Sequence, residues 1–215
     1  MDKRGEKKTR LSIPKSSGSW PSRLRMGLDP ELVGLKAFES TAVRNYWRWL
    51  LEDYTPRSRV ALVTPCSNVK PYPLSPPSRR VRGILKRLGL WEPAGREPAK
   101  GRPKGVEWLY FSDLLVFVPY EKAWEHPACC YDVSPDLVIE NGYADLIASL
   151  ASRAIERLAE NGVERIIVRL PKKHKRIFSK AYREAEMRPA IVEVPYNLFY
   201  YRRLEEAIIE ALGLR

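Results

Sequence analysis

Residues 59–65 have the sequence Arg-Val-Ala-Leu-Val-Thr-Pro, an apolar run in which hydrophobic and polar side chains do not alternate. Such a run is typical of a strand that is buried on both faces of a parallel sheet. Similar runs occur at 165–168 and 190–194, and strand pieces are expected at 108–111 and 114–118. The sequence therefore predicts an α/β fold, a three-layer sandwich in which helices cover a mostly parallel four-stranded sheet.

Helical patterns lie between and after these strands. They are expected near residues 40–54, 78–88, 135–161, 172–186 and 198–212, the third with a possible break at Asn141-Gly142. Residues 1–29 are basic and poor in apolar side chains, so we expect a flexible arm there. Residues 30–215 are expected to form a single α/β domain.

The composition limits the class of protein. No apolar run approaches the roughly 20 residues that a membrane-spanning helix needs. The charged start of the chain does not resemble a secretory signal. Only three cysteines are present and two of them are adjacent, which argues against a disulfide framework. We therefore expect a reduced, cytoplasmic protein. The chain also lacks glutamine and is rich in proline, as thermophile proteins often are.

The charge predicts a polyanionic partner. The formal net charge is +12, and basic residues gather in segments 1–30, 70–104 and 169–188. Nucleic acid is the commonest partner of such a protein, although a solvated basic surface is the alternative. The residues expected to contact nucleic acid are Arg79, Arg80 and Arg82 in one basic helix, and Lys172, Lys173, His174, Lys175 and Arg176 at the start of another.

The loop that follows the 59–65 strand carries the candidate chemistry. In an α/β sheet, ligands bind beyond the carboxyl ends of the strands. Prolines stiffen this loop, and a thiol, Cys66, and an ammonium group, Lys70, lie between them. These two are expected to be catalytic, unless Cys66 is a buried structural cysteine and Lys70 is solvated. The expected substrate-binding residues are Pro65, Ser67, Asn68, Pro71, Tyr72 and Ser75.

Asp132 is a third candidate catalytic residue, which could orient a base edge or a reacting group; a carboxylate at a helix start is the alternative. No metal site is predicted, because His126 beside the Cys129-Cys130 pair does not have a recognised ligand spacing. No glycine-rich nucleotide loop occurs, so no cofactor is expected either.

Two stretches resemble the archaeosine synthase family of archaeal tRNA-modifying proteins. The first contains Pro65-Cys66, Lys70-Pro71-Tyr72 and Ser75, which match the family signature Pro-Cys, Lys-Pro-Tyr and Ser. The second, residues 111–133, contains Phe-Ser-Asp, Val-Pro-Tyr-Glu, His-Pro-Ala and Tyr-Asp-Val, and relatives carry a similar series. The sequence departs from the signature at Ser78, where the family has histidine. We expect no counterpart of the family's transglycosylase-like and RNA-binding domains within these 215 residues.

The resemblance implies a fold like that of uracil-DNA glycosylases. It also implies a role in modifying a 7-cyano-7-deazaguanine base in tRNA, with lysine added to the nitrile, and tRNA and lysine as partners. The chain could be one subunit of such an enzyme, working with a transglycosylase-like or radical-enzyme subunit. A thiol can add to a nitrile to give a thioimidate, so Cys66 is expected to attack or cradle the nitrile carbon. Two alternatives are a non-catalytic RNA-binding module and a glycosylase-like enzyme acting on a flipped base.

Overall fold

The computed structural model describes residues 23–24, 27–95, 99–197 and 200–214. Most of the predicted arm, residues 1–29, lies outside the described residues. Within the arm, residues 23–24 form a two-residue strand, β1 (Arg23–Leu24), parallel to β3 (Val69–Lys70). This part of the arm therefore lies against the loop in which the candidate chemistry was predicted.

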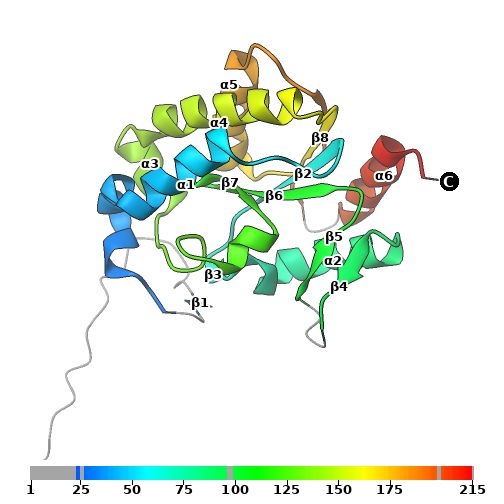
Figure 1. Cartoon of the computed structure of the whole chain (residues 1–215), viewed down its shortest axis with the longest axis horizontal. Coiled ribbons are helices and arrows are strands. Elements are labelled where there is room, and N and C mark those ends of the chain that lie inside the picture. Colours follow the sequence, from blue (N-terminus) through cyan, green and yellow to red (C-terminus); the bar gives the residue numbers. More distant parts are fainter. Residues whose placement is uncertain (1–22, 25–26, 96–98, 198–199, 215) are drawn as a thin grey trace, which may run out of the picture.

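A five-stranded central sheet organises the chain (Figure 1). Its order is β7 (Val116–Pro119), β6 (Glu107–Ser112), β2 (Val60–Pro65), β8 (Arg165–Val168) and β9 (Ala190–Glu193). The pairs β6–β2, β2–β8 and β8–β9 are parallel, which confirms the predicted parallel sheet. The predicted count of four strands was wrong, because the chain reverses after Ser112 and β7 adds an antiparallel fifth strand.

Helices cover both faces of this sheet. One face carries α1 (Thr41–Glu52), α4 (Tyr143–Glu160) and α5 (Lys172–Glu184), and the other carries α2 (Pro76–Arg87) and α6 (Tyr201–Leu212) (Figure 1). Short elements complete the chain: η1 (Pro30–Leu32), η2 (Gly34–Glu39), η3 (Tyr72–Leu74), η4 (Glu121–Trp124), α3 (Pro135–Glu140), and the antiparallel pair β4 (Trp91–Pro93) and β5 (Gly101–Pro103). Gly142, in the left-handed region at φ 78°, separates α3 from α4 at the predicted break.

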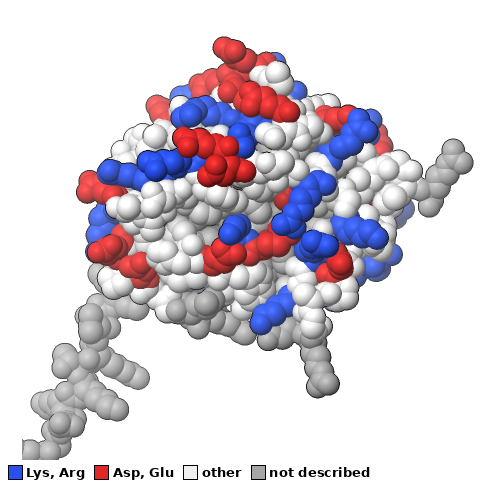
Figure 2. Space-filling model, in the orientation of Figure 1, with Lys and Arg blue, Asp and Glu red and all other residues white. Residues whose placement is uncertain are grey.

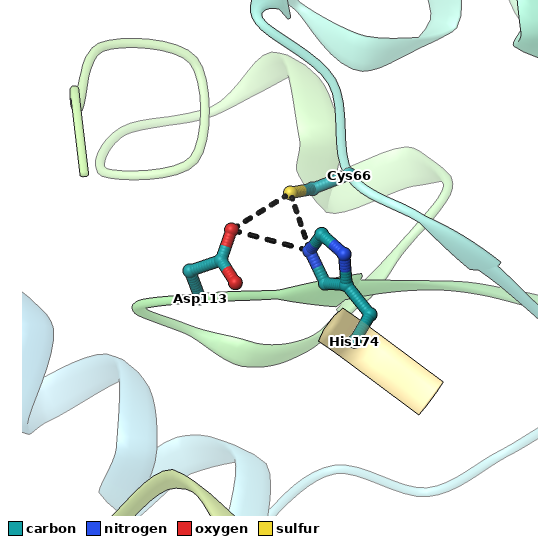
Figure 3. Close-up of side chains that lie close together, drawn as sticks. All are labelled: Cys66, Asp113 and His174. Atoms are coloured by element: carbon teal, nitrogen blue, oxygen red, sulfur yellow. Dashed lines mark hydrogen bonds and ion pairs between the residues drawn. The ribbon is translucent and has the colours of Figure 1, made fainter. Parts of the chain in front are cut away.

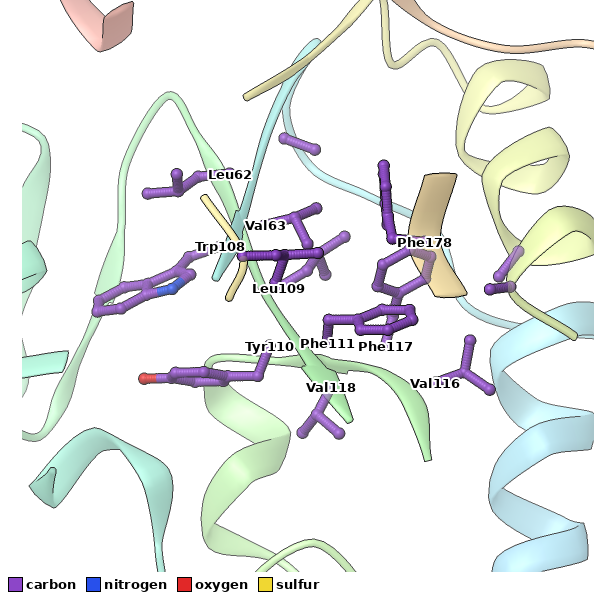
Figure 4. Close-up of a cluster of buried hydrophobic side chains, with 14 of the residues drawn as sticks. Leu62, Val63, Trp108, Leu109, Tyr110, Phe111, Val116, Phe117, Val118 and Phe178 are labelled. Carbon is purple, nitrogen blue, oxygen red and sulfur yellow. The ribbon is translucent and has the colours of Figure 1, made fainter. Parts of the chain in front are cut away.

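Alternate residues of β6 point to opposite faces of the sheet and fill two separate layers of core (Figure 4). Trp108 and Tyr110 pack together on one face, with ring centroids 5.3 Å apart. Phe111 lies on the other face, 5.8 Å from the ring of Phe178 on α5. Each fully buried large side chain contributes roughly 1.5–3 kcal/mol, whereas an exposed ion pair contributes about 0–1 kcal/mol. The apolar layers therefore hold α5, which carries His174, against the sheet.

No helix within the described parts of the chain has the length and apolar character that crossing a membrane requires.

Candidate functional site

The candidate site lies at the edge where the four parallel strands end. Cys66 directly follows β2, Asp113 follows β6, and Arg169 follows β8. Hydrogen bonds join neighbouring strand ends: the amide of Cys66 donates to the carbonyl of Phe111 at 2.9 Å, and that of Arg169 to the carbonyl of Val63 at 2.9 Å. The parallel register thus brings together three loops that are far apart in the sequence.

Three reactive side chains converge at this edge (Figure 3). The Sγ atom of Cys66 lies 3.6 Å from Oδ2 of Asp113 and 3.6 Å from Nε2 of His174. The same Nε2 and Oδ2 atoms are 3.2 Å apart. Each residue therefore contributes one atom to a compact triangle. A thiol, a carboxylate and an imidazole can together move protons, activate a nucleophile or bind a metal ion.

Local structure holds each member of the triangle in place. The Ser112 hydroxyl accepts hydrogen bonds from the amides of Leu114 and Leu115, at 3.2 and 3.0 Å, which closes the turn that contains Asp113. Val116 completes this turn at φ 68°, a strained conformation for a β-branched residue. His174 is positioned differently, because it lies in the first turn of α5, which is separated from the end of β8 by three residues.

Burial and charge act in opposite directions on His174. Asp113 and His174 are buried, whereas Cys66 is half-buried. Burial alone lowers the pKa of His174, but the negative charge of Asp113 and the hydrogen bonds with Asp113 and Cys66 raise it well above its usual value of 6.5. The imidazole therefore favours its positively charged form between two acidic partners.

Lys70 belongs to an adjoining aromatic cluster. Its Nζ atom lies 4.1 Å from the ring centroid of Tyr131 and 5.9 Å from that of Tyr72. The Tyr72 hydroxyl donates to the Tyr131 hydroxyl, which lies 2.7 Å from the hydroxyl of Ser112. Burial lowers the pKa of Lys70, while the charges of Cys66, Asp132 and Asp113 oppose that effect. Lys70 is thus buried beside the triangle, and the predicted alternative of a solvated Lys70 was wrong.

Several predicted substrate-binding residues have local structural contacts. Ser75 is 1% exposed and caps α2, where its hydroxyl accepts from the amide of Ser78 at 3.3 Å. The Ser67 hydroxyl accepts from the amide of Val69 at 3.0 Å within the loop. Ser75 is therefore buried at its own helix start, and its role as a substrate contact stays a prediction.

The remaining predicted residues of the loop and of the second stretch occupy different positions. Asn68 is exposed, Pro65 ends β2, and Pro71 precedes η3. The carbonyl of Asp132 accepts from the amide of Gly34, and its charge acts on Lys70. Asp132 is therefore close to the cluster, but Asp113 is the carboxylate that meets Cys66.

The predicted nucleic-acid contacts divide into exposed and buried residues. Arg82 is 6% exposed, and its guanidinium donates to the carbonyl of Pro73 and the hydroxyl of Tyr120, so it is not placed to meet a phosphate. His174 is buried in the triangle. The exposed members are Arg79, Arg80, Lys172, Lys173, Lys175 and Arg176.

Acidic residues accompany several of the exposed cations. Lys173 forms an ion pair with Asp136, and Lys175 forms one with Glu193 at 2.6 Å. On the face shown in Figure 2, lysines and arginines are interspersed with acidic residues. The basic charge of this face is therefore partly balanced locally.

Comparison with known proteins bears on the fold alone. No family model matches the chain, and no curated protein matches its sequence. The crystal structure of AF0587, a protein of unknown function, is similar with a TM-score of 0.51 at 16% identity, over 79% of this chain and 50% of that chain. This chain thus spans about half the length of that structure. At this level of identity the likeness concerns the fold alone.

Sequence reasoning missed two members of the triangle. The sequence names Asp113 only as part of the second family-like stretch, and it predicts that His174 contacts nucleic acid. One signal was available, because both residues closely follow predicted strands. The strand order β6–β2–β8, which the sequence does not reveal, places their two loops on either side of Cys66.

Proposed function

We propose that this protein modifies a nucleobase in tRNA, adding lysine to the nitrile of a 7-cyano-7-deazaguanine base as the resemblance to archaeosine synthases implies. The observation that carries the proposal is the contact between the two family-like stretches. Cys66 and Lys70 come from the first stretch and meet Asp113 and Tyr131 of the second, 3.6 and 4.1 Å away. A signature that is split in the sequence thus forms one site.

The chemistry of the proposed reaction suits the groups present. The amine nitrogen of lysine bonds to the nitrile carbon, one carbon–nitrogen π bond breaks, and a proton moves from the amine to the former nitrile nitrogen. The product is an amidine, and neither an oxidant nor a leaving group is needed. In this proposal His174 and Asp113 would move protons, and Lys70 would stabilise negative charge that develops on the nitrile nitrogen.

The net charge and the sheet also support the proposal. A net charge of +12 favours binding to the phosphates of tRNA. We further propose that the four parallel strands and their helices correspond to the uracil-DNA-glycosylase-like fold. In such a fold, a base flipped out of the RNA would enter at the carboxyl ends of the strands, where the triangle lies.

The test is a lysine-addition assay with the full chain. Transfer RNA that carries 7-cyano-7-deazaguanine is incubated with lysine, digested and examined by mass spectrometry for a nucleoside heavier by one lysine. Asp113→Asn should slow the addition by about 100-fold or more, while Asp145→Asn, at an exposed carboxylate, should not. A folded protein that binds this tRNA but adds no lysine would contradict the proposed enzymatic activity and would favour a non-catalytic tRNA-binding module.

A further inference from the structure

The triangle of Cys66, Asp113 and His174 differs in geometry from a nucleophile–histidine–carboxylate catalytic triad. In such a triad, one imidazole nitrogen faces the nucleophile and the other faces the carboxylate. Here the single Nε2 atom of His174 faces both Sγ of Cys66 and Oδ2 of Asp113. One N–H group donates well to only one of them. The thiol and the carboxylate are also close to each other, so all three donor atoms lie within 3.6 Å of one another.

We infer that Cys66, Asp113 and His174 bind a zinc ion through Sγ, Oδ2 and Nε2. Zinc bonds of about 2.3 Å to sulfur and about 2.0–2.1 Å to nitrogen and oxygen, at tetrahedral angles, place sulfur roughly 3.5 Å from the other two donors and nitrogen roughly 3.3 Å from oxygen. The corresponding distances in this protein are 3.6, 3.6 and 3.2 Å. The three side chains are therefore already spaced as zinc ligands.

The donor atoms favour zinc over magnesium and calcium. A thiolate and an imidazole suit zinc, whereas the latter two ions prefer oxygen ligands. Thiolate and carboxylate together carry two negative charges, which balance the charge of the ion. The second oxygen of Asp113, Oδ1, is buried and has no hydrogen-bond partner among the described residues. A cation bound at Oδ2 would offset the cost of burying the negative charge of this carboxylate.

Three protein ligands leave one tetrahedral position open, as in catalytic rather than structural zinc sites. Cys66 is half-buried whereas the other two ligands are buried, so the open position is reached from the Cys66 side. A bound zinc ion could polarise a nitrile or lower the pKa of a bound water molecule. In this arrangement the Cys66 thiolate is a ligand and not the attacking nucleophile. The metal site does not need the proposed tRNA reaction to occur, but a bound ion would occupy Nε2 of His174 and Oδ2 of Asp113 and would replace their proton transfer by polarisation of the nitrile.

The first experiment measures metal content in the purified full chain. The protein is stripped with a chelator, equilibrated with zinc and dialysed, and zinc is then counted by elemental mass spectrometry. About one ion per chain is expected. Cys66→Ser, Asp113→Asn and His174→Ala should each weaken zinc binding about 100-fold or more. Cys130→Ser and His126→Asn, matched changes at a second half-buried cysteine and an exposed histidine, should retain the ion.

Cobalt provides a readout that depends on the ligand set. Cobalt(II) added to the stripped protein should give a thiolate-to-metal charge-transfer absorption, and Cys66→Ser should remove it while Cys130→Ser keeps it. Circular dichroism checks that each variant is folded. The inference is overturned if the folded wild-type chain takes up no zinc, or if the control variants lose the ion as completely as the triangle variants do. Failure of lysine addition with zinc bound would leave the metal site standing and reject only the tRNA reaction.

Discussion

The Nζ atom of Lys70 lies 4.1 Å from the ring centroid of Tyr131, and Lys70 is only 3% exposed. The attraction between the ammonium group and the aromatic ring compensates for part of the hydration free energy that Lys70 loses on burial. Burial nevertheless lowers the pKa of Lys70, so on balance its surroundings disfavour the charged form relative to water. A buried lysine with a lowered pKa, beside a triangle of reactive groups, is a candidate functional residue.

Lys70→Met should therefore separate stability from function. Methionine keeps the length and the apolar stem of the side chain but removes the charge. We expect the free energy of unfolding to stay within about 1 kcal/mol of wild type or to rise, while lysine addition to tRNA falls. Denaturant titration and the lysine-addition assay measure the two effects. A loss of stability beyond about 2 kcal/mol, the strength of a desolvated cation–π contact, would show that the ammonium group mainly holds the fold.

Ser75→Ala should act on the start of α2. The Ser75 hydroxyl is the N-cap, so its removal should cost about 1 kcal/mol of unfolding free energy. Ser134→Ala provides a matched control, since Ser134 caps α3 in the same way, at 3.3 Å from the amide of Leu137. Ser75→Ala should lose somewhat more stability than Ser134→Ala, because the Ser75 hydroxyl also donates to the buried Ser78 hydroxyl at 2.9 Å, and both variants should keep lysine addition per folded molecule. Selective loss of addition in Ser75→Ala would support the predicted substrate contact.

Glu107 should make stability depend on pH. Its carboxylate accepts from the Tyr54 hydroxyl at 2.6 Å and from the amide of Arg57 at 2.8 Å. Burial raises the pKa of Glu107 above 4.5, although these two hydrogen bonds oppose the rise. The folded state therefore holds this proton more tightly than the unfolded state does.

The stabilisation from protonated Glu107 is complete below pH 4.5 and is lost as pH rises through the elevated pKa. Glu107→Gln cannot titrate at this position. The unfolding free energy of wild type minus that of Glu107→Gln should therefore fall as pH rises from 4.5 through the raised pKa of Glu107. Denaturant titrations at successive pH values would measure this difference. A difference that is constant or that increases with pH would contradict the raised pKa.

Binding to tRNA should weaken steeply as salt increases, because lysines and arginines displace counterions from phosphates. Lys172 and Arg176 are exposed on α5 and lie one turn apart, on the helix that carries His174. Replacing both by alanine should reduce the slope of log affinity against log salt by about 1 for each cation that pairs with a phosphate. Fluorescence anisotropy across a salt series measures this slope.

Arg203→Ala, a control change at an exposed residue of α6, should leave the slope unchanged. Equal effects of all three changes would indicate that no particular face binds tRNA.

The sequence alone determined the layered α/β design and most of the helix boundaries. Unbroken apolar runs such as 59–65 and 165–168 favour strands buried on both faces, and such burial requires helices above and below the sheet. Capping residues and the glycine at 142 are equally local signals, because they act on the backbone within a few positions. The sequence does not reveal β7 as a separate antiparallel strand, because the turn between Ser112 and Val116 contains two apolar residues, Leu114 and Leu115. The apolar run therefore continues without a break through the turn.

Only the tertiary structure decided which groups meet Cys66. Asp113 is 47 positions away and His174 is 108, and no periodicity in the sequence relates them. Strand order and register determine the meeting, since β6 and β8 pair with β2 on its two sides and end beside it. That order depends on how the whole set of side chains packs, including the layer that seats Phe178 of α5 against Phe111. Local patterns therefore identified the loop that contains the thiol, whereas packing across the sheet supplied its carboxylate and imidazole.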